Sequence, residues 1–296
     1  MAVEELRTRF REVVNQRDWP AVLEIGEQLH TARDFGRPLG LYAFWMEIAA
    51  GNLGRRWEAV RHSRLGLSLV EPASELEARL LSNGTYSAWL CHQPNRAIRL
   101  GSIYTDRYDR YPPSGQGQLA RVLHHMAMAY QDRDDLAEAI RLHEAALVEA
   151  ERHGEPGWAD VIRADLAVAL LRQGRSDSVD LAEGHLACLD PETLPGRARL
   201  AYLMGRAELL YRCGEFAHSL SVCDRALSCA DRVSEALVRQ RTEVTLLKAK
   251  GHWALGHRYE ALLFGLRAAL SFQGCGTRSD LDRCAIFLEA VSGTVR

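Results

Sequence analysis

Apolar residues return every three or four positions along almost the whole chain. In residues 136–150, LAEAIRLHEAALVEA, the side chains of Leu136, Ile140 and Leu147 fall on one side of a helix together with Ala139 and Ala146. This spacing predicts amphipathic helices, because a helix turns about once every 3.6 residues. Valine-rich stretches such as SVDLAEG and ALVRQRTEV keep the same spacing rather than the alternation of strands. The pattern therefore predicts an all-α protein.

Small residues recur along the chain at a nearly constant interval. Ala139 is followed by another small residue seven positions later, and equivalent anchor positions occur at residues 21, 59, 97, 139, 179, 219 and 261. Successive anchors are 38 to 42 residues apart. A repeat of this length predicts one helical hairpin, which buries its faces only by stacking on its neighbours. Small side chains allow the close approach of helices where they cross.

Each repeat has the same internal layout. An amphipathic helix is followed by a short break and by a second helix that carries the anchor. The break often contains a glycine, which tolerates the left-handed conformation that ends many helices; these are Gly54, Gly174, Gly214 and Gly256. We predict a single domain over 1–296, with units 1–36, 37–72, 73–113, 114–154, 155–194, 195–232 and 233–274 and a capping helix over 277–292.

The units resemble tetratricopeptide repeats. The match is carried by Leu123, Ala127 and Tyr130 on one predicted helix and by Leu136, Ala139 and Ala146 on the next. The resemblance implies a right-handed superhelical solenoid of about seven helical hairpins with a C-terminal capping helix. The period of about 40 exceeds the 34 usual for that family, and longer repeats of this kind are similar to those of bacterial signal-sensing regulators. Such solenoids bind peptides, small effectors or partner proteins.

Composition narrows the classes of function. Basic and acidic residues number 37 and 39, giving a formal charge of −2, which argues against direct nucleic-acid binding because that requires clustered positive charge. Only two of the basic residues are lysines, Lys248 and Lys250. The seven cysteines show no C-x-x-C pair, and the chain has neither a leader-like start nor a membrane-length apolar run. We expect a cytoplasmic protein with no membrane association.

Motifs for catalysis or cofactor binding do not emerge from the sequence. It contains no phosphate-binding glycine loop of the common kinds and no G-x-S-x-G nucleophile turn. PPSGQGQLA is interpreted as a linker rather than an anion site. His124, His125 and His143 lack a carboxylate or cysteine at ligand spacing, so no metal is expected. Asp134 and Asp135 suit a helix N-terminus. We therefore expect no enzyme activity and no cofactor.

The first helices of successive hairpins line the concave side of such a solenoid, which suits an extended or helical peptide. Helical spacing places a set of arginine, aromatic, methionine and other polar residues there: Arg79, Tyr86, Arg121, His124, Met128, Gln131, Glu208, Tyr211 and Lys250, with Met204 and Glu243 on the same faces. The leading interpretation is a regulatory scaffold that binds a protein or peptide. A sensor of a small-molecule or peptide effector and self-association into a homo-oligomer are the alternatives.

Overall fold

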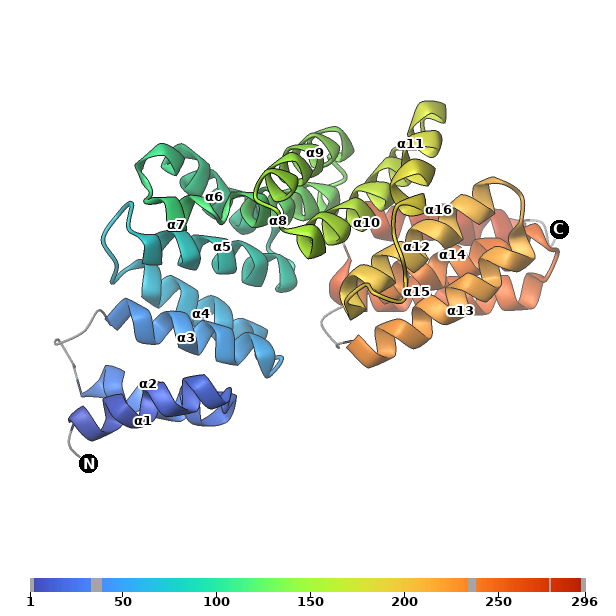
Figure 1. The fold of residues 1–296 in the computed structure, drawn as a ribbon. Coiled ribbons are helices and arrows are strands. Elements are labelled where there is room, and N and C mark those ends of the chain that lie inside the picture. The colour runs from blue at the N-terminus through green and yellow to red at the C-terminus, as the bar shows by residue number, and fades with distance from the viewer. Residues whose placement is uncertain (1–2, 33–38, 234–237, 277, 294–296) are drawn as a thin grey trace. The chain divides into compact units, whose positions relative to one another are not determined.

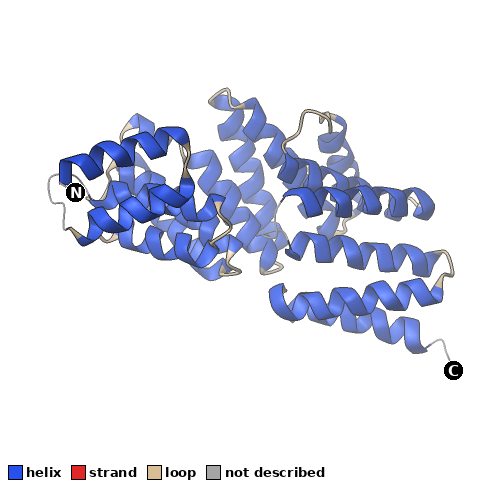
Figure 2. Cartoon of the chain, turned by 90° about the horizontal axis from the view of Figure 1, so that it is seen from below, coloured by secondary structure: helices blue, strands red, loops and turns tan. Residues whose placement is uncertain are grey.

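The structure is a computed structural model that describes residues 3–32, 39–233, 238–276 and 278–293. Within these ranges the chain is built from helices and contains no strand (Figure 2). The described part also contains no helix with both the length and the apolar character needed to cross a membrane. The predicted all-α class is confirmed.

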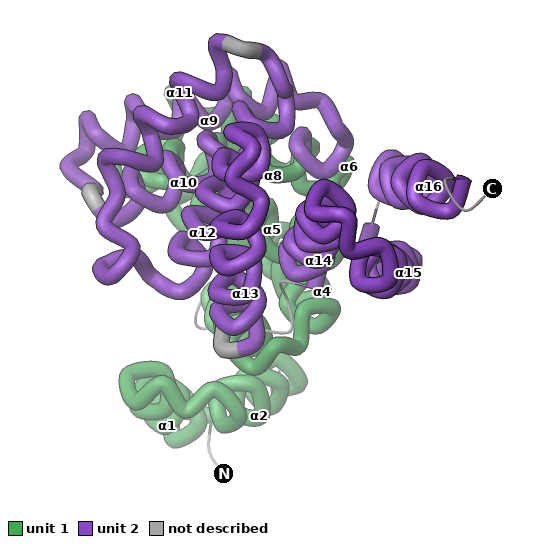
Figure 3. Tube along the Cα trace, turned by 90° about the vertical axis from the view of Figure 1, so that its right-hand side faces the viewer, with its two compact units in different colours: residues 1–129 green, residues 130–296 purple. Residues whose placement is uncertain are grey.

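The chain divides into two compact units, residues 1–129 and 130–296, coloured separately in Figure 3. The described helices of the first unit pack in sequence order (Figure 1). They are α1 (Val3–Gln16), α2 (Trp19–Thr31), α3 (Leu39–Asn52), α4 (Arg56–Leu67), α5 (Glu75–Leu90) and α6 (Pro94–Asp106), followed by the short η1 (Tyr108–Arg110) and α7 (Pro113–Gln116). Helix α8 (Leu119–Asp132) runs across the boundary between the two units.

The second unit continues the pairing of helices. It holds α9 (Leu136–Arg152), α10 (Pro156–Gln173), α11 (Ser176–Ala187), α12 (Gly196–Arg212), α13 (Phe216–Val233), α14 (Val238–Ala254), α15 (Arg258–Cys275) and α16 (Arg278–Gly293). Within this unit α10 contacts α12, α12 contacts α14, and α14 contacts α16. The first helices of successive pairs therefore lie next to one another, as the repeat pattern predicts.

Each pair of helices turns on one residue in the left-handed conformation. The four predicted glycines, Gly54, Gly174, Gly214 and Gly256, have φ between 73° and 80°. In the other three turns a residue with a side chain takes this place: Arg17, His92 and Asp134, with φ of 56° to 65°. Next to Asp134, Asp135 caps α9 by accepting a hydrogen bond from the Glu138 amide, as predicted from its position.

These turns lead to a paired prediction for two exposed glycines. A Cβ added at Gly214 meets no neighbouring atom, but its φ of 80° is unfavourable for alanine, so Gly214→Ala should destabilise the fold by about 1–2 kcal/mol. A Cβ at Gly184 also meets nothing, but Gly184 lies inside α11. Gly184→Ala should therefore stabilise by about 0.5–1 kcal/mol. Urea unfolding of the two variants measures both shifts, and shifts of the same sign would contradict the assignment.

Small residues occupy the places where helices cross. The anchors Ala59, Ala97, Ala139 and Ala261 are buried. A side chain on Gly66 would run into Leu80, and one on Gly265 into Phe287 of α16. Helix α16 buries Cys284, Phe287 and Val291 against its neighbours, so the predicted capping helix is confirmed. The predicted junction at 36/37 and the predicted cap start at Thr277 lie outside the described residues, and the division into seven units stays a prediction.

Candidate functional site

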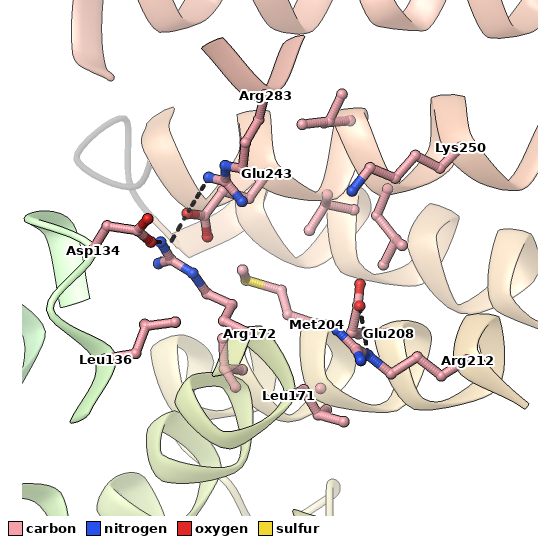
Figure 4. Close-up of a pocket in the computed structure, with 15 residues that line it drawn as sticks. Asp134, Leu136, Leu171, Arg172, Met204, Glu208, Arg212, Glu243, Lys250 and Arg283 are labelled. Atoms are coloured by element: carbon pink, nitrogen blue, oxygen red, sulfur yellow. Dashed lines mark hydrogen bonds and ion pairs between the residues drawn. The ribbon is translucent and has the colours of Figure 1, made fainter. Parts of the chain in front are cut away.

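A pocket of about 300 Å³ lies among the first helices of the second unit (Figure 4). Helices α10, α12, α14 and α16 supply most of its wall, and the turn before α9 closes one end. The lining residues are Asp134, Leu136, Val168, Leu171, Arg172, Met204, Gly205, Glu208, Arg212, Glu243, Val244, Leu246, Leu247, Lys250 and Arg283. The lining thus combines apolar and charged side chains.

The repeat itself brings these positions together. Val168, Glu208 and Lys250 occupy equivalent places in three successive repeats, because the anchors 179, 219 and 261 are offset by 40 and 42 residues. Arg172 and Arg212 are equivalent in the same way, one helical turn further on. Since first helices of successive pairs are neighbours, one face of each contributes to the same pocket.

Most charges of the pocket neutralise one another. Glu243 has guanidinium nitrogens of Arg172 and Arg283 at 3.5 and 3.9 Å, and Arg172 also contacts Asp134 at 3.2 Å. On the opposite wall, Arg212 donates a hydrogen bond of 2.9 Å to Glu208. Figure 4 shows these side chains, which come from α10, α12, α14, α16 and the turn before α9. The arrangement holds all three carboxylates of the lining in ion pairs.

Behind this wall lies a second, more deeply buried set of charges. Arg239, at the start of α14, is 4% exposed and makes two-nitrogen contacts of 3.1 to 3.3 Å with Asp280 of α16, which is 1% exposed. Arg239 also pairs with Asp132 and lies 3.5 Å from Glu243. Asp280 in turn pairs with Arg283. The pocket wall is therefore connected by charge to the packing of the capping helix.

Lys250 differs from the other cations of the lining. Its ammonium group makes no hydrogen bond or ion pair with any described residue, although its side chain is half-buried in the wall and points into the pocket (Figure 4). Burial lowers the pKa of this ammonium; Glu208 opposes the change, and Arg283 and Arg212 add to it. A desolvated cation without a partner favours binding of an anionic group.

The lowered pKa predicts unusual reactivity. At about pH 8 a larger fraction of Lys250 should be neutral and nucleophilic than of a lysine with an ordinary pKa. Lys248, the other lysine of the chain, is held in an ion pair with Asp224 at 2.5 Å. We therefore expect an acetylating reagent to modify Lys250 several-fold faster than Lys248, with the ratio falling at high pH, where lysines in general are neutral. Mass spectrometry of proteolytic peptides measures the rates, and faster modification of Lys248 would contradict this.

The residues predicted from sequence fall into separate groups. Glu208 and Lys250 line the pocket, and so do Met204 and Glu243 from the same predicted faces. Tyr211 is half-buried against Phe216, with ring centroids 5.4 Å apart, and lies outside the lining. Arg79, Tyr86 and Arg121 belong to the first unit, where Arg79 pairs with Glu75 and Tyr86 stacks on Trp89.

Three of the predicted groove residues are buried instead of accessible. His124, Met128 and Gln131 are 0%, 4% and 9% exposed. Helix α8 buries residues on nearly all sides, so the spacing that separates an inner from a packed face elsewhere does not do so here. The expected accessibility of these three side chains is therefore corrected, and they are removed from the candidate site.

The histidines of the fourth repeat are also interior groups. His143 is fully buried, and burial, reinforced by Arg197, lowers its pKa to about 3. In the part of the chain that the structure describes, no three histidine, cysteine or acidic side chains are grouped to hold a metal ion. Among the charged lining residues, the sequence did not assign Asp134, Arg172, Arg212 or Arg283 to the site. Applying the repeat offset to Glu208 and Arg212 points to Val168 and Arg172, whereas nothing in the sequence of α16 singles out Arg283.

The paired helices and the shared face of their first members define a helical repeat fold of the kind seen in tetratricopeptide repeat proteins. The chain matches no protein-family model and no curated protein sequence. Solved structures resemble it over nearly its whole length. A tetratricopeptide repeat protein from Parabacteroides merdae has a TM-score of 0.60 at 13% identity, with 98% of each chain covered.

Two further solved structures have the same fold. A Rap protein complexed with Competence and Sporulation Factor has a TM-score of 0.56 at 12% identity, covering 99% of this chain and 86% of that one. Aspartyl phosphate phosphatase F from Bacillus subtilis has a TM-score of 0.53 at 10% identity, covering 100% and 94%. At these identities the likeness establishes the fold.

Proposed function

We propose that this chain is a non-catalytic scaffold that binds a peptide or protein segment in the pocket of its second unit. The observation that carries the proposal is Lys250, a half-buried cation with no hydrogen bond or ion pair to the described residues, set above apolar side chains. An anionic group bound there would form a charge-assisted hydrogen bond with the ammonium and so replace the hydration that burial removes.

The lining indicates what such a segment should contain. Val168, which is half-buried, and Met204 offer an apolar surface above the buried Leu171, and Lys250 lies beyond them on α14. A segment with an acidic group beside an apolar side chain matches both features. Support also comes from the Rap protein of similar fold, which is complexed with Competence and Sporulation Factor.

The proposal does not require a catalytic group. Asp134, Glu208 and Glu243, the carboxylates of the lining, are each held by an arginine, so none is placed as a free general base. A cytoplasmic location and a regulatory role are part of the same proposal. The seven cysteines are free thiols, five of them buried, which fits a reducing compartment.

Selection from a random peptide library displayed on phage tests the proposal. Wild-type protein should enrich sequences with an acidic residue beside an apolar one, and the enriched peptides should bind Lys250→Met at least tenfold more weakly in calorimetry. Lys248→Met is the matched control, because Lys248 lies on the same helix but pairs with Asp224 outside the lining. Enrichment of no peptide, or equal binding by both variants, would reject the peptide assignment.

A small anionic effector is the second candidate. The pocket volume of about 300 Å³ lies at the lower end of the range for small-molecule sites. Native mass spectrometry of protein purified from its own cells would show a retained small molecule, and Lys250→Met should abolish its retention. A purified protein without added mass, together with peptide enrichment, favours the scaffold over the sensor.

A further inference from the structure

Helix α15 carries a stripe of exposed apolar side chains. Tyr259, Leu266 and Leu270 are 73%, 52% and 66% exposed, and Leu263 between them is half-buried. Their spacing of four, three and four residues places all four on one side of the helix over about three turns. A stripe of this length on an open helix face requires an explanation.

The stripe lies on the side of α15 opposite the face that packs against neighbouring helices. Ala261, Gly265, Ala268 and Phe272 are the buried positions, turned toward α14 and α16. Residues of the stripe are rotated by about half a turn from these positions. Helix α15 is thus apolar on both sides, whereas a surface helix ordinarily has one apolar side. In Figure 3 it lies beside α14 and α16.

Equivalent positions of the other repeats do not share this property. With Ser219 aligned to Ala261, the stripe of α15 corresponds in α13 to Ala217, Ser221, Asp224 and Ser228. With Ala139 aligned in the same way, the corresponding residues of α9 are Ala137, Arg141, Glu144 and Val148. The repeat scaffold therefore does not require apolar residues here, and α15 alone of these three helices has four.

We propose that α15 docks on α15 of a second copy of this chain, with the two helices antiparallel. The spacing of the stripe is that of the core positions of a two-helix coiled coil. In an antiparallel pair, Tyr259 would face Leu270 of the second copy, and Leu263 would face Leu266. A symmetric pair of this kind closes on itself and gives a dimer rather than a polymer.

Charges beside the stripe are self-complementary in this arrangement. Glu260 and Arg267 flank it on the same side, seven residues apart. In the antiparallel register set by the apolar layers, Glu260 of each copy comes opposite Arg267 of the other, so two opposite-charge pairs form. A parallel arrangement would place Glu260 and Arg267 of the two copies on opposite sides of the pair and lose both contacts. The charge pattern therefore selects a second copy and its direction.

Analytical ultracentrifugation of the full chain tests the inference. The contact is short, so a weak dimer is expected, with an apparent mass that rises with concentration from 33.2 kDa toward twice that value. The variant Tyr259→Ala, Leu263→Ser, Leu266→Asp, Leu270→Ser gives α15 the outward residues of α13 and should remain a monomer with an unchanged circular dichroism spectrum. Val148→Ser, which changes a 54% exposed side chain of α9, is the control that should still dimerise.

Charge reversal tests the direction of the helices. Arg267→Glu should raise the dimer Kd about tenfold, because each dimer then contains two like-charge pairs. Glu260→Arg with Arg267→Glu should restore the wild-type Kd. A wild-type chain that stays monomeric up to about 1 mM would overturn the proposal. So would a dimer that survives the fourfold variant, while failure of the double reversal to restore association would overturn the antiparallel register.

Discussion

Replacing Arg239 with methionine should lower the unfolding free energy of the second unit by about 3–5 kcal/mol. Arg239 is buried against Asp280 and also pairs with Asp132, so its removal takes this guanidinium from both buried carboxylates and leaves Asp280 with Arg283 alone. A buried charge that loses its partner cannot recover its hydration, and this cost exceeds the attraction that the pair contributed. Urea unfolding followed by circular dichroism measures the change.

A second arginine of the same helix provides the control. Arg241 pairs with Asp231 at 3.0 Å, but both side chains are more than half exposed. Arg241→Met should therefore change stability by no more than about 0.5 kcal/mol. The double variant Arg239→Met with Asp280→Leu should lose less stability than Arg239→Met alone. It removes the Asp280 carboxylate, which would otherwise stay buried without the Arg239 guanidinium. Equal losses for Arg239→Met and Arg241→Met would show that the buried cluster contributes nothing.

Replacing Tyr104 with alanine should destabilise the first unit by about 3–5 kcal/mol. Tyr104 is fully buried in α6 and stacks on Tyr111 with ring centroids 5.1 Å apart. Its hydroxyl donates to the carbonyls of Gly115 and Gln116 at 2.8 and 3.0 Å. One side chain therefore attaches the irregular segment that contains η1 and α7 to the helices before it.

Tyr104→Phe separates the ring from the hydroxyl. This variant keeps the stacking on Tyr111 but removes the hydroxyl from both carbonyls, of which Gly115 keeps the Gln118 amide, so about 1–3 kcal/mol of the loss should remain. Thermal and urea unfolding of the first unit report both values. Tyr108, whose ring is more distant from Tyr104 at 6.3 Å, is the comparison, and Tyr108→Phe should be near neutral. An effect of Tyr104→Ala no larger than that of Tyr108→Phe would contradict this role.

The repeat pattern predicts the helical architecture well because both its causes are local. Both the helical spacing and the left-handed turn depend on residues close together in the sequence. The turns at Gly54, Gly174, Gly214 and Gly256 are examples. The turns at Arg17, His92 and Asp134 have the same conformation with no glycine to signal it. There the repeat interval, rather than the residue type, indicates the turn.

The candidate site is less predictable from sequence because it depends on which charges meet. Glu208 and Lys250 follow from helix spacing, since each lies on the face that first helices share. Helix spacing does not predict the burial of His124 and Met128. It shows which residues share a face of α8, but not how many of its faces are covered by neighbouring helices. Arg283 reaches the pocket from α16, a helix expected only to cover apolar surface.

The seven left-handed turn residues have a consequence for how such a chain can change length during evolution. They follow one another at intervals of 37 to 42 residues. The repeats therefore differ in length, while each turn keeps one residue in the left-handed conformation. The differences lie in the lengths of the helices and in the connections between pairs, as with η1 and α7 after α6. A duplicated pair would bring its own turn with it, and the array could gain or lose a whole repeat without redesign of the turns that remain.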